Sequence, residues 1–196
     1  MLSNLELTAE AGQVIGILGK NGAGKTTLFE AIYQNIQYQG QILWKNQNLR
    51  KSEVAYLETE HYFYPYITGE EYLSYFFFTP ENELQKWLNS FQLPLKRYVQ
   101  EYSTGMKKKL ALLGILALNQ PVIILDEPFN GVDFEGVHHI YEMIKEQKQK
   151  GKLILMSSHI VETLFHTCDA VAILKNGHFE SIYSKEAFNQ LSYFSF

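Results

Sequence analysis

The chain has 196 residues, which is room for one medium-sized domain with a hydrophobic core and too little for two large ones. Apolar residues make up 46% and charged residues 19% of the sequence, a globular balance that argues against a disordered chain. The formal net charge of −4 makes the chain a poor candidate for binding nucleic acid through phosphate contacts. A single cysteine, Cys168, excludes an internal disulfide or a cysteine-rich zinc site and favours a reducing compartment.

Neither a membrane span nor a signal peptide is expected. The longest apolar stretch, residues 110–118, covers nine residues, whereas a membrane span needs about 20. Residues 1–10 lack a basic region followed by an apolar one. One compositional feature is unusual, because nine aromatic residues fall between Tyr62 and Phe78.

The first half of the chain begins with strand patterns and becomes helical. An apolar run predicts a buried strand over residues 14–18. A glycine-rich segment follows, and then a helix expected over residues 25–34. Short strands are expected at 41–44 and 54–57. Helices are then predicted over residues 70–78, 81–91 and 104–118, with Pro80 and Pro94 between them.

The second half returns to alternating strands and helices. A fully apolar strand is predicted at 122–125, then a helix over 134–150 that Asp133 caps and Gly151 ends. Strands follow at 153–156 and 171–174, and Asn176-Gly177 predicts a tight hairpin turn into a final strand. The alternation favours parallel βαβ units. We therefore expect an α/β fold, a single domain over residues 1–196 with a helical insertion at about 65–117.

A glycine-rich loop carries the first chemical signal. Residues 19–26 read GKNGAGKT and match the phosphate-binding pattern GxxxxGK[ST] between an expected strand and helix. Glycines let backbone N–H groups turn toward phosphate oxygens, and the helix N-terminus adds partial positive charge. Lys25 is placed to reach the β- and γ-phosphates of a nucleotide, and Thr26 to offer a hydroxyl to Mg²⁺. The predicted nucleotide-binding residues are Gly19, Asn21, Gly22, Ala23, Gly24, Lys25, Thr26 and Thr27.

Two adjacent carboxylates follow the strand at 122–125. The carboxyl ends of parallel strands form the ligand-binding edge of an open α/β sheet. Successive strand residues point in opposite directions, so the two acids are expected to have different roles. Asp126 suits the Mg²⁺ shell together with Thr26, and Glu127 suits positioning or deprotonating an attacking water. A charged turn after a core strand is the competing interpretation, which the phosphate loop weakens.

Four further segments, in order along nearly the whole chain, resemble motifs of the nucleotide-binding subunit of ABC transporters. The segment 56–72 resembles the Q-loop, 102–106 (YSTGM) the signature motif, 130–133 the D-loop with Asp133, and 157–159 (SSH) the switch histidine His159. The YSTGM form, followed by a run of three lysines, is similar to bacterial exporter-type ATPases of the ABC-2 class. That lysine run would place positive charge near the nucleotide or would form a solvated helix face; it consists of Lys107, Lys108 and Lys109.

The resemblance implies a fold and a mechanism. The fold would be a P-loop NTPase core, a RecA-like sheet with flanking helices, with an inserted helical subdomain and a small N-terminal antiparallel β part. Two subunits would face head to tail, as a homodimer or heterodimer, with ATP and Mg²⁺ between them. Ser103, Thr104 and Gly105 would contact the partner's ATP, Glu127 would act as the catalytic base, and His159 would hold the γ-phosphate and the water.

The implied enzyme is an ATP hydrolase that drives a separate transmembrane permease subunit, whose transported substrate the sequence does not identify. It would be cytoplasmic and peripheral on the inner face of the cell membrane through that permease. The alternative is a nucleotide-dependent regulatory protein or a soluble ABC ATPase with weak hydrolysis and no transport role. The chain resembles a cassette shortened at its start, without most of the first strand and without its adenine-stacking aromatic residue. ATP binding is therefore expected to be about tenfold to a hundredfold weaker, unless another residue covers the adenine.

The sequence departs from the family pattern at the Q-loop and the signature motif. Thr59 aligns with the Q-loop glutamine, and it is flanked by Glu58 and Glu60, either of which would take its place if the alignment is shifted by one residue. A threonine hydroxyl can bind Mg²⁺ but reaches less far than a glutamine amide, so hydrolysis is expected to be slow or differently coupled. Thr59→Gln is predicted to raise or preserve turnover. In the signature motif, Thr104 stands where glycine is usual and Met106 where glutamine is usual. Ser103 could instead simply cap a helix, and Asp133 could be only a cap.

The aromatic segment and the remaining histidines leave alternatives open. Tyr62, Phe63, Tyr64 and Tyr66 would form a groove for a helix of the membrane partner, or would belong to the helical core. The core interpretation is stronger for Tyr72, Tyr75, Phe76 and Phe77. Surface or packing roles are expected for the remaining histidines, which are His61, His138, His139, His166 and His178.

Overall fold

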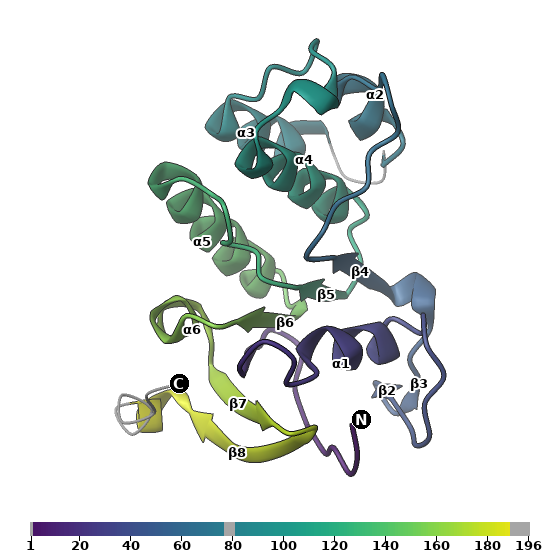
Figure 1. Ribbon diagram of the computed structural model, residues 1–196, viewed down its shortest axis with the longest axis vertical. Helices are drawn as coiled ribbons and strands as arrows, with labels where there is room; N and C mark the ends of the chain where they lie inside the picture. Colours follow the sequence, from purple (N-terminus) through teal and green to yellow (C-terminus); the bar gives the residue numbers. More distant parts are fainter. Residues whose placement is uncertain (1, 77–80, 189–196) are drawn as a thin grey trace.

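The computed structural model describes residues 2–76 and 81–188, and a six-stranded sheet forms its centre (Figure 1). The strands are β1 (Val14–Leu18), β2 (Leu43–Trp44), β3 (Gln47–Asn48), β4 (Val54–Leu57), β5 (Val122–Leu125), β6 (Leu153–Ser158), β7 (Ala170–Lys175) and β8 (His178–Ser184). In the large sheet the order is β4-β5-β6-β1-β7-β8. Its pairs are parallel except for β8, which pairs antiparallel with β7. The strands β2 and β3 form a separate antiparallel pair.

Helices occupy both faces of the sheet and one end of the molecule (Figure 1). They are α1 (Lys25–Ile32), α2 (Gly69–Ser74), α3 (Glu81–Phe91), α4 (Thr104–Ala117), α5 (Phe134–Gln149) and α6 (Val161–Thr167), with the 3₁₀ helices η1 (Lys51–Glu53) and η2 (Val99–Glu101). In the part of the chain that is described, no helix is both long and apolar enough to cross a membrane.

The strands β1, β4, β5 and β6 are buried along their whole length, as expected for a parallel sheet that is covered on both faces. Alternate residues of β5 belong to different cores because strand side chains alternate between faces. Ile123 and Leu125 join the core on the side of the longer helices. Val122 and Ile124 join the second core, which contains Phe29 of α1. The carboxyl ends of the strands are therefore fixed from both sides.

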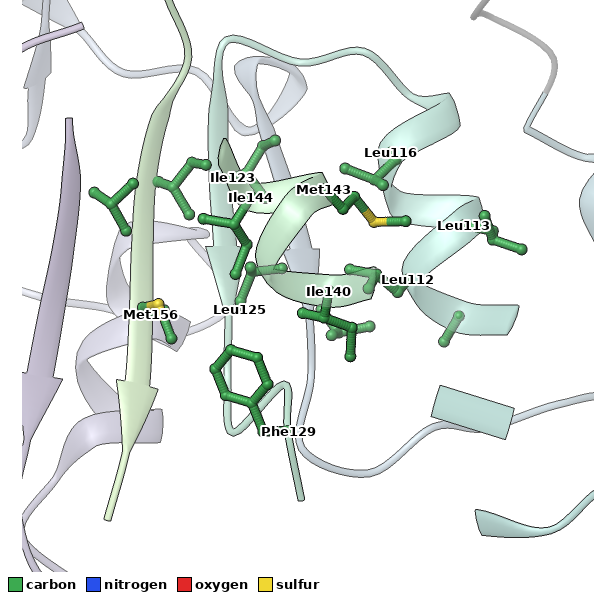
Figure 2. Close-up of a cluster of buried hydrophobic side chains, with 14 of the residues drawn as sticks. Leu112, Leu113, Leu116, Ile123, Leu125, Phe129, Ile140, Met143, Ile144 and Met156 are labelled. Carbon is green, nitrogen blue, oxygen red and sulfur yellow. The ribbon is translucent and has the colours of Figure 1, made fainter. Parts of the chain in front are cut away.

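The larger core lies between β5, α4 and α5. Figure 2 shows Ile140, Met143 and Ile144 of α5 between leucines of α4 and side chains of β5. Their spacing of three and four residues places them on one face of the helix. All three are at most 4% exposed, and burial of a side chain of this kind stabilises a fold by about 1.5–3 kcal/mol.

The helices α2, α3 and α4 lie together at one end of the molecule and come between β4 and β5 in the sequence (Figure 1). They fall within the helical insertion expected at about residues 65–117. The α/β class, the parallel core and the small antiparallel pair agree with the sequence-based expectation. That residues 1–196 form one domain, with this part as a subdomain, stays a prediction.

Most predicted elements are present, with shifts at their ends. The helix expected over 25–34 ends at Ile32, because Gln34 has a φ of 62°. The strand expected at 41–44 is shorter and pairs with β3, which the sequence did not predict, through a turn in which Lys45 and Asn46 have φ values of 50° and 62°. The short helix α6 was also missed. Residues 77–78, expected at the end of a helix, lie outside the described residues.

Candidate functional site

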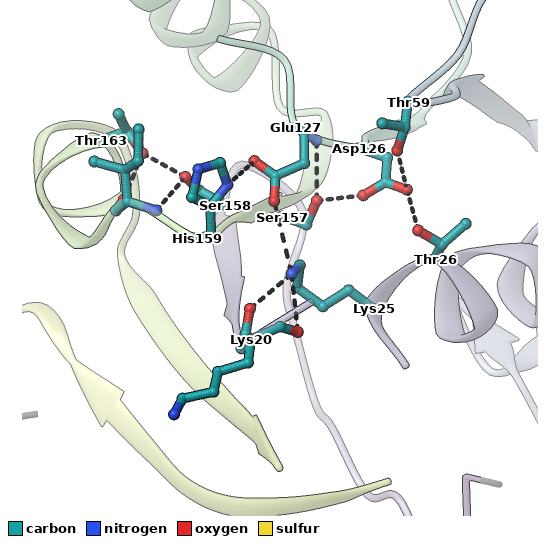
Figure 3. A network of polar contacts seen from close by, with 12 residues as sticks. Lys20, Lys25, Thr26, Thr59, Asp126, Glu127, Ser157, Ser158, His159 and Thr163 are labelled. Atoms are coloured by element: carbon teal, nitrogen blue, oxygen red, sulfur yellow. Dashed lines mark hydrogen bonds and ion pairs between the residues drawn. The ribbon is translucent and has the colours of Figure 1, made fainter. Parts of the chain in front are cut away.

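The strand ends at one edge of the sheet bring together residues far apart in the sequence (Figure 3). The glycine-rich loop follows β1, Thr59 follows β4, Asp126 and Glu127 follow β5, and Ser157, Ser158 and His159 lie at the end of β6. These four parallel strands are neighbours in the sheet, so their carboxyl ends converge on one place, as expected for a ligand site in an open α/β sheet.

The glycine-rich loop connects β1 to α1 with backbone that side chains would obstruct. Gly22 and Gly24 have φ values of 82° and 108°, a region that glycine adopts at low cost. A Cβ on Gly19 would lie 2.6 Å from the carbonyl oxygen of Leu174. Ala23 is half-buried, and the side chains of Asn21 and Thr27 are exposed. The predicted loop residues thus surround the N-terminus of α1, which favours anions.

Lys25 is buried and points back across the loop. Its ammonium group donates hydrogen bonds to the carbonyl oxygens of Gly19 at 2.6 Å and Lys20 at 3.4 Å. It also lies 3.6 Å from Oε1 of Glu127. Since Lys25 is 7% exposed and Glu127 12% exposed, this ion pair is largely shielded from solvent. The lysine expected to bind phosphate and the expected catalytic base are therefore direct neighbours.

Asp126 gathers three hydroxyl groups from three elements. Its Oδ2 accepts hydrogen bonds from Oγ1 of Thr26 at 2.6 Å and of Thr59 at 2.8 Å. Its Oδ1 accepts a hydrogen bond from Oγ of Ser157. At 1% exposure, the carboxylate depends on these donors, because a buried charge without partners is costly. The sequence placed Thr26 and Asp126 together, but it gave no sign of a role for Ser157.

Glu127 has an unusual backbone conformation and two side-chain neighbours. Its φ is 51°, in the left-handed region that residues other than glycine seldom adopt. Its N–H donates to Oγ of Ser157 at 2.9 Å, and its carbonyl oxygen accepts from Nζ of Lys108 at 2.8 Å. Its Oε2 lies 3.0 Å from Nδ1 of His159, whose side chain is 47% exposed. The carboxylate thus lies between Lys25 and His159 (Figure 3).

The signature-like segment lies at the start of α4, beside the turn that leads into α5. Ser103 caps α4, since its hydroxyl accepts a hydrogen bond from the N–H of Met106. Gly105 is buried, and a Cβ there would lie 2.6 Å from the carbonyl oxygen of Gly131. Thr104 is exposed. Among the described residues, no hydrogen bond or ion pair joins this segment to the phosphate loop of the same chain.

The lysine run divides into one half-buried and two buried side chains. Lys108 and Lys109 are 3% and 8% exposed, so the expectation of a solvated face is wrong for both. Lys109 donates to both carboxylate oxygens of Asp133 at 2.8 and 3.1 Å. Asp133 also caps α5 by accepting from the N–H of Gly136 at 2.8 Å. The hydrogen bond from Lys109, supported by that backbone bond, lowers the pKa of the Asp133 carboxyl.

A half-buried histidine of this region is His61, which follows Thr59 by two positions. Burial lowers its pKa to about 4, and the positive charge of Lys108 acts in the same direction. Its Nε2 has no hydrogen-bond partner among the described residues. The packing role expected for His61 fits this geometry. No group of three or more His, Cys, Asp or Glu side chains in the described ranges is arranged to hold a metal ion.

The aromatic segment alternates between exposed and packed side chains. Tyr62, Tyr64 and Tyr66 are 79%, 71% and 71% exposed. Phe63 instead packs on Tyr72, with ring centroids 4.9 Å apart. The two interpretations of this segment therefore apply to different residues, with the tyrosines at the surface and Phe63 against the core.

A buried strand, a glycine-rich turn with its lysine, and a strand-end aspartate bonded to the threonine of the same turn define a P-loop nucleotide-binding fold. The family model for ABC transporters matches residues 2–130. The chain belongs to the ABC transporter ATP-binding family.

Similar proteins agree with this membership. An uncharacterized ABC transporter ATP-binding protein of Synechocystis, sll0415, is 32% identical over 90% of this chain and 54% of its own length. A solved structure of the ATP-binding subunit of an ABC transporter is 29% identical, with a TM-score of 0.86 over 97% of this chain and 87% of that one. The dimeric ATP-binding cassette MJ0796 with bound ADP and Pi shares the fold, at 20% identity and a TM-score of 0.81 over 94% and 90% of the two chains.

The lengths of the relatives differ from that of this chain. The chain spans 54%, 66% and 57% of the length of three curated relatives that it matches.

Proposed function

We propose that the protein binds and hydrolyses ATP as the nucleotide-binding subunit of an ABC transporter. The observation that carries this proposal is the position of Glu127 between Lys25 and His159, beside the hydroxyl-bonded Asp126. A base beside a phosphate-binding lysine is the arrangement that water-mediated phosphoryl transfer requires.

Each group of site residues would have a separate role in the hydrolysis of ATP. The loop of Gly19, Asn21, Gly22, Ala23, Gly24 and Thr27, with the N-terminus of α1, would bind the phosphates. Lys25 would exchange its contact with Glu127 for the γ-phosphate, because the phosphate carries more negative charge. Glu127 would then be free to accept a proton from the attacking water, and His159 would hold that water and the γ-phosphate.

The residues around Asp126 fit a bound Mg²⁺. Magnesium in nucleotide sites is held by one or two carboxylates and by phosphates, with oxygen ligands throughout. Asp126 supplies the carboxylate and Thr26 a hydroxyl 2.6 Å from it, and the hydroxyl of Thr59 is 2.8 Å from the same oxygen. When bound, the ion would neutralise charge that develops on the β- and γ-phosphates.

A second nucleotide-binding subunit would complete the site. In this chain Ser103, Thr104 and Gly105 lie at the N-terminus of α4, where free N–H groups favour an anion. No hydrogen bond or ion pair joins them to the phosphate loop of the same chain within the described residues, which supports a role toward the ATP of a partner subunit. Asp133 would contribute from the adjoining turn as a D-loop residue. The MJ0796 cassette, similar in fold, is a dimer.

A separate permease would receive the conformational change. The exposed tyrosines at positions 62, 64 and 66 form a surface that suits an amphipathic helix of such a partner. The YSTGM segment, which is followed by three lysines, supports an exporter of the ABC-2 type. The protein would then act on the cytoplasmic side of the membrane, held there by the permease.

The test compares the purified wild-type chain with Glu127→Gln. We expect Mg²⁺-dependent ATP hydrolysis by the wild type and a loss of about 10²–10⁴-fold in the variant, the usual contribution of a general base. Binding of a fluorescent ATP analogue should be retained, because the phosphate loop is untouched. A wild-type chain that binds ATP without hydrolysing it would favour the alternative, a nucleotide-dependent regulatory protein.

A further inference from the structure

Helix α4 buries a lysine that the ATP-binding site described above does not use. Lys108 is 3% exposed, although burial of an ammonium group is costly unless a partner compensates it. Burial lowers its pKa, and the carboxylates of Glu127 and Asp126 oppose that effect. Its ammonium group donates a hydrogen bond to the backbone carbonyl oxygen of Glu127, at 2.8 Å, and not to either of these carboxylates.

That carbonyl belongs to a residue whose backbone needs support. With a φ of 51°, Glu127 occupies a conformation that is strained for a side chain with a Cβ, and such strain persists only where surrounding contacts hold it. Three hydrogen bonds do so. Ser157 of β6 accepts the N–H of Glu127 at 2.9 Å, and the carbonyl oxygen of Glu127 accepts from Lys108 of α4 at 2.8 Å and from the N–H of Asn130 at 3.2 Å. The lysine is the only one of the three partners that comes from α4.

The conformation decides where the carboxylate points. A change of φ at Glu127 to the right-handed or extended region would swing its side chain away from the space between Lys25 and His159. The neighbouring lysines offer no substitute donor, since Lys109 is bonded to Asp133. Lys107 is half-buried and has no described contact with Glu127.

We propose that Lys108 is a positioning residue for ATP hydrolysis, which holds Glu127 from helix α4 so that its carboxylate faces the γ-phosphate site. The proposal rests on the proposed ATPase function. Through this hydrogen bond, Lys108 would couple the start of α4 to the catalytic base of the same chain, because a displacement of α4 would move the ammonium group of Lys108 away from Glu127.

The experiment measures kcat, KM, affinity for a fluorescent ATP analogue and thermal stability in three variants. Lys108→Met keeps the length of the side chain but removes the donor, and we expect kcat to fall about tenfold to a hundredfold with nucleotide affinity unchanged. Its melting temperature should hold or rise, because a buried cation becomes an apolar side chain. Lys108→Gln keeps an N–H donor and should recover most of the wild-type kcat. Lys107→Met is the matched control and should resemble the wild type.

A mutant cycle with Glu127→Gln separates positioning from a general structural role. If Lys108 acts through Glu127, Lys108→Met should add little to the loss already caused by Glu127→Gln. Additive losses, or an unchanged kcat in Lys108→Met, would overturn the proposal.

Two further results are distinguishable. If Lys108→Met does not fold, Lys108→Gln and Lys108→Glu make the same comparison, because the two side chains have the same shape and only glutamine has the amide donor. Equal rates of ATP hydrolysis in these two variants would contradict the proposal. A wild-type chain without hydrolysis would instead overturn the proposed function itself.

Discussion

Asp126 shows how three hydroxyl groups are brought to one carboxylate. Thr26 lies on α1, Ser157 on β6 and Thr59 in the loop after β4, and each donates to Asp126. Thr59 therefore stands within reach of any ion that Asp126 binds. Its side chain is shorter than the glutamine expected at this position, yet its hydroxyl bonds directly to the carboxylate.

The first prediction concerns Thr59. Thr59→Val removes the hydroxyl that donates to Oδ2 of Asp126 at 2.8 Å, so we expect Mg²⁺ to strengthen nucleotide binding less than in the wild type. Titration of a fluorescent ADP analogue with and without Mg²⁺ measures this effect, and Thr59→Ser, which keeps the hydroxyl, is the control.

Thr59→Gln gives the complementary change, for which we expect turnover to be preserved or raised. A large fall in turnover in that variant would mean that the threonine is itself specialised for this site.

The second prediction is a pH dependence of stability that arises at His61. Its pKa is about 4 in the folded chain against 6.5 ordinarily, so the unfolded chain binds more protons between these values. Stability therefore rises with pH through this window, and it is lost as the pH falls from about 6.5 toward 4. His61→Phe should flatten this part of the profile of melting temperature against pH.

The control for His61 is His138→Phe, because His138 is exposed on α5. Equal slopes in His61→Phe and the wild type would show that other groups cause the acid sensitivity.

Much of the site could be predicted at the level of single residues, and its limits have a physical cause. The glycines, Lys25, Thr26 and the two acids follow from a local motif and from strand ends. The contacts of Ser157, Lys108 and Lys109 could not be predicted, because they depend on how α4 and β6 pack beside β5. A run of lysines in a sequence predicts a solvated helix face, unless the hydrogen-bond acceptors that pack against it are known.

At the scale of elements, caps fix where the functional segments begin. Ser103, Asp133 and Thr68 each accept a backbone N–H in the first turn of α4, α5 and α2. The cap at Asp133 and its bond to Lys109 tie the start of α5 to α4. The two roles expected for Asp133, as a helix cap and as a D-loop residue, can thus coexist.

The third prediction follows from this double contact. Asp133→Ala should lower the free energy of unfolding by about 0.5–2 kcal/mol through the lost cap, and further because Lys109 is left buried without its carboxylate. Chemical denaturation measures the change. Asp133→Asn keeps a cap and should cost less, whereas equal losses in the two variants would mean that Lys109 is indifferent to the charge.

Elements with strong local signals were predictable and short ones were not. The buried strands are runs of apolar residues, and the Asn176-Gly177 turn has the positive φ values of 51° and 82° that such a pair adopts readily. The strand β3 has two residues and α6 has seven. Segments this short are fixed by tertiary packing rather than by their own periodicity.

At the scale of the molecule, the aromatic segment belongs to the end that holds α2, α3 and α4, away from β2 and β3 (Figure 1). Tyr62 and Tyr64 contact each other edge to face, with centroids 5.6 Å apart, and both stay exposed. Their side chains add little to folding, which leaves them available to a partner.

The fourth prediction tests this surface. Tyr62→Ala with Tyr64→Ala should reduce co-purification with the permease while the melting temperature and basal ATP hydrolysis stay close to wild type, because both rings are exposed. Tyr38→Ala, an exposed tyrosine between α1 and β2, is the control. Undiminished complex formation would assign the tyrosines no part in docking.

The position of β4 at the edge of the sheet has a consequence for the dynamics of the site. Within the described sheet β4 is bonded to β5 alone, and Thr59 is separated from Asp126 by 67 positions in the chain. Closing so long a segment is entropically costly, and an edge strand opens more readily than a central one. Amide protons of β4 should therefore exchange with solvent deuterium earlier than those of β1 or β6. A ligand that joins Thr59 to Asp126 would slow that exchange, so deuterium uptake at β4 would report occupancy of the site.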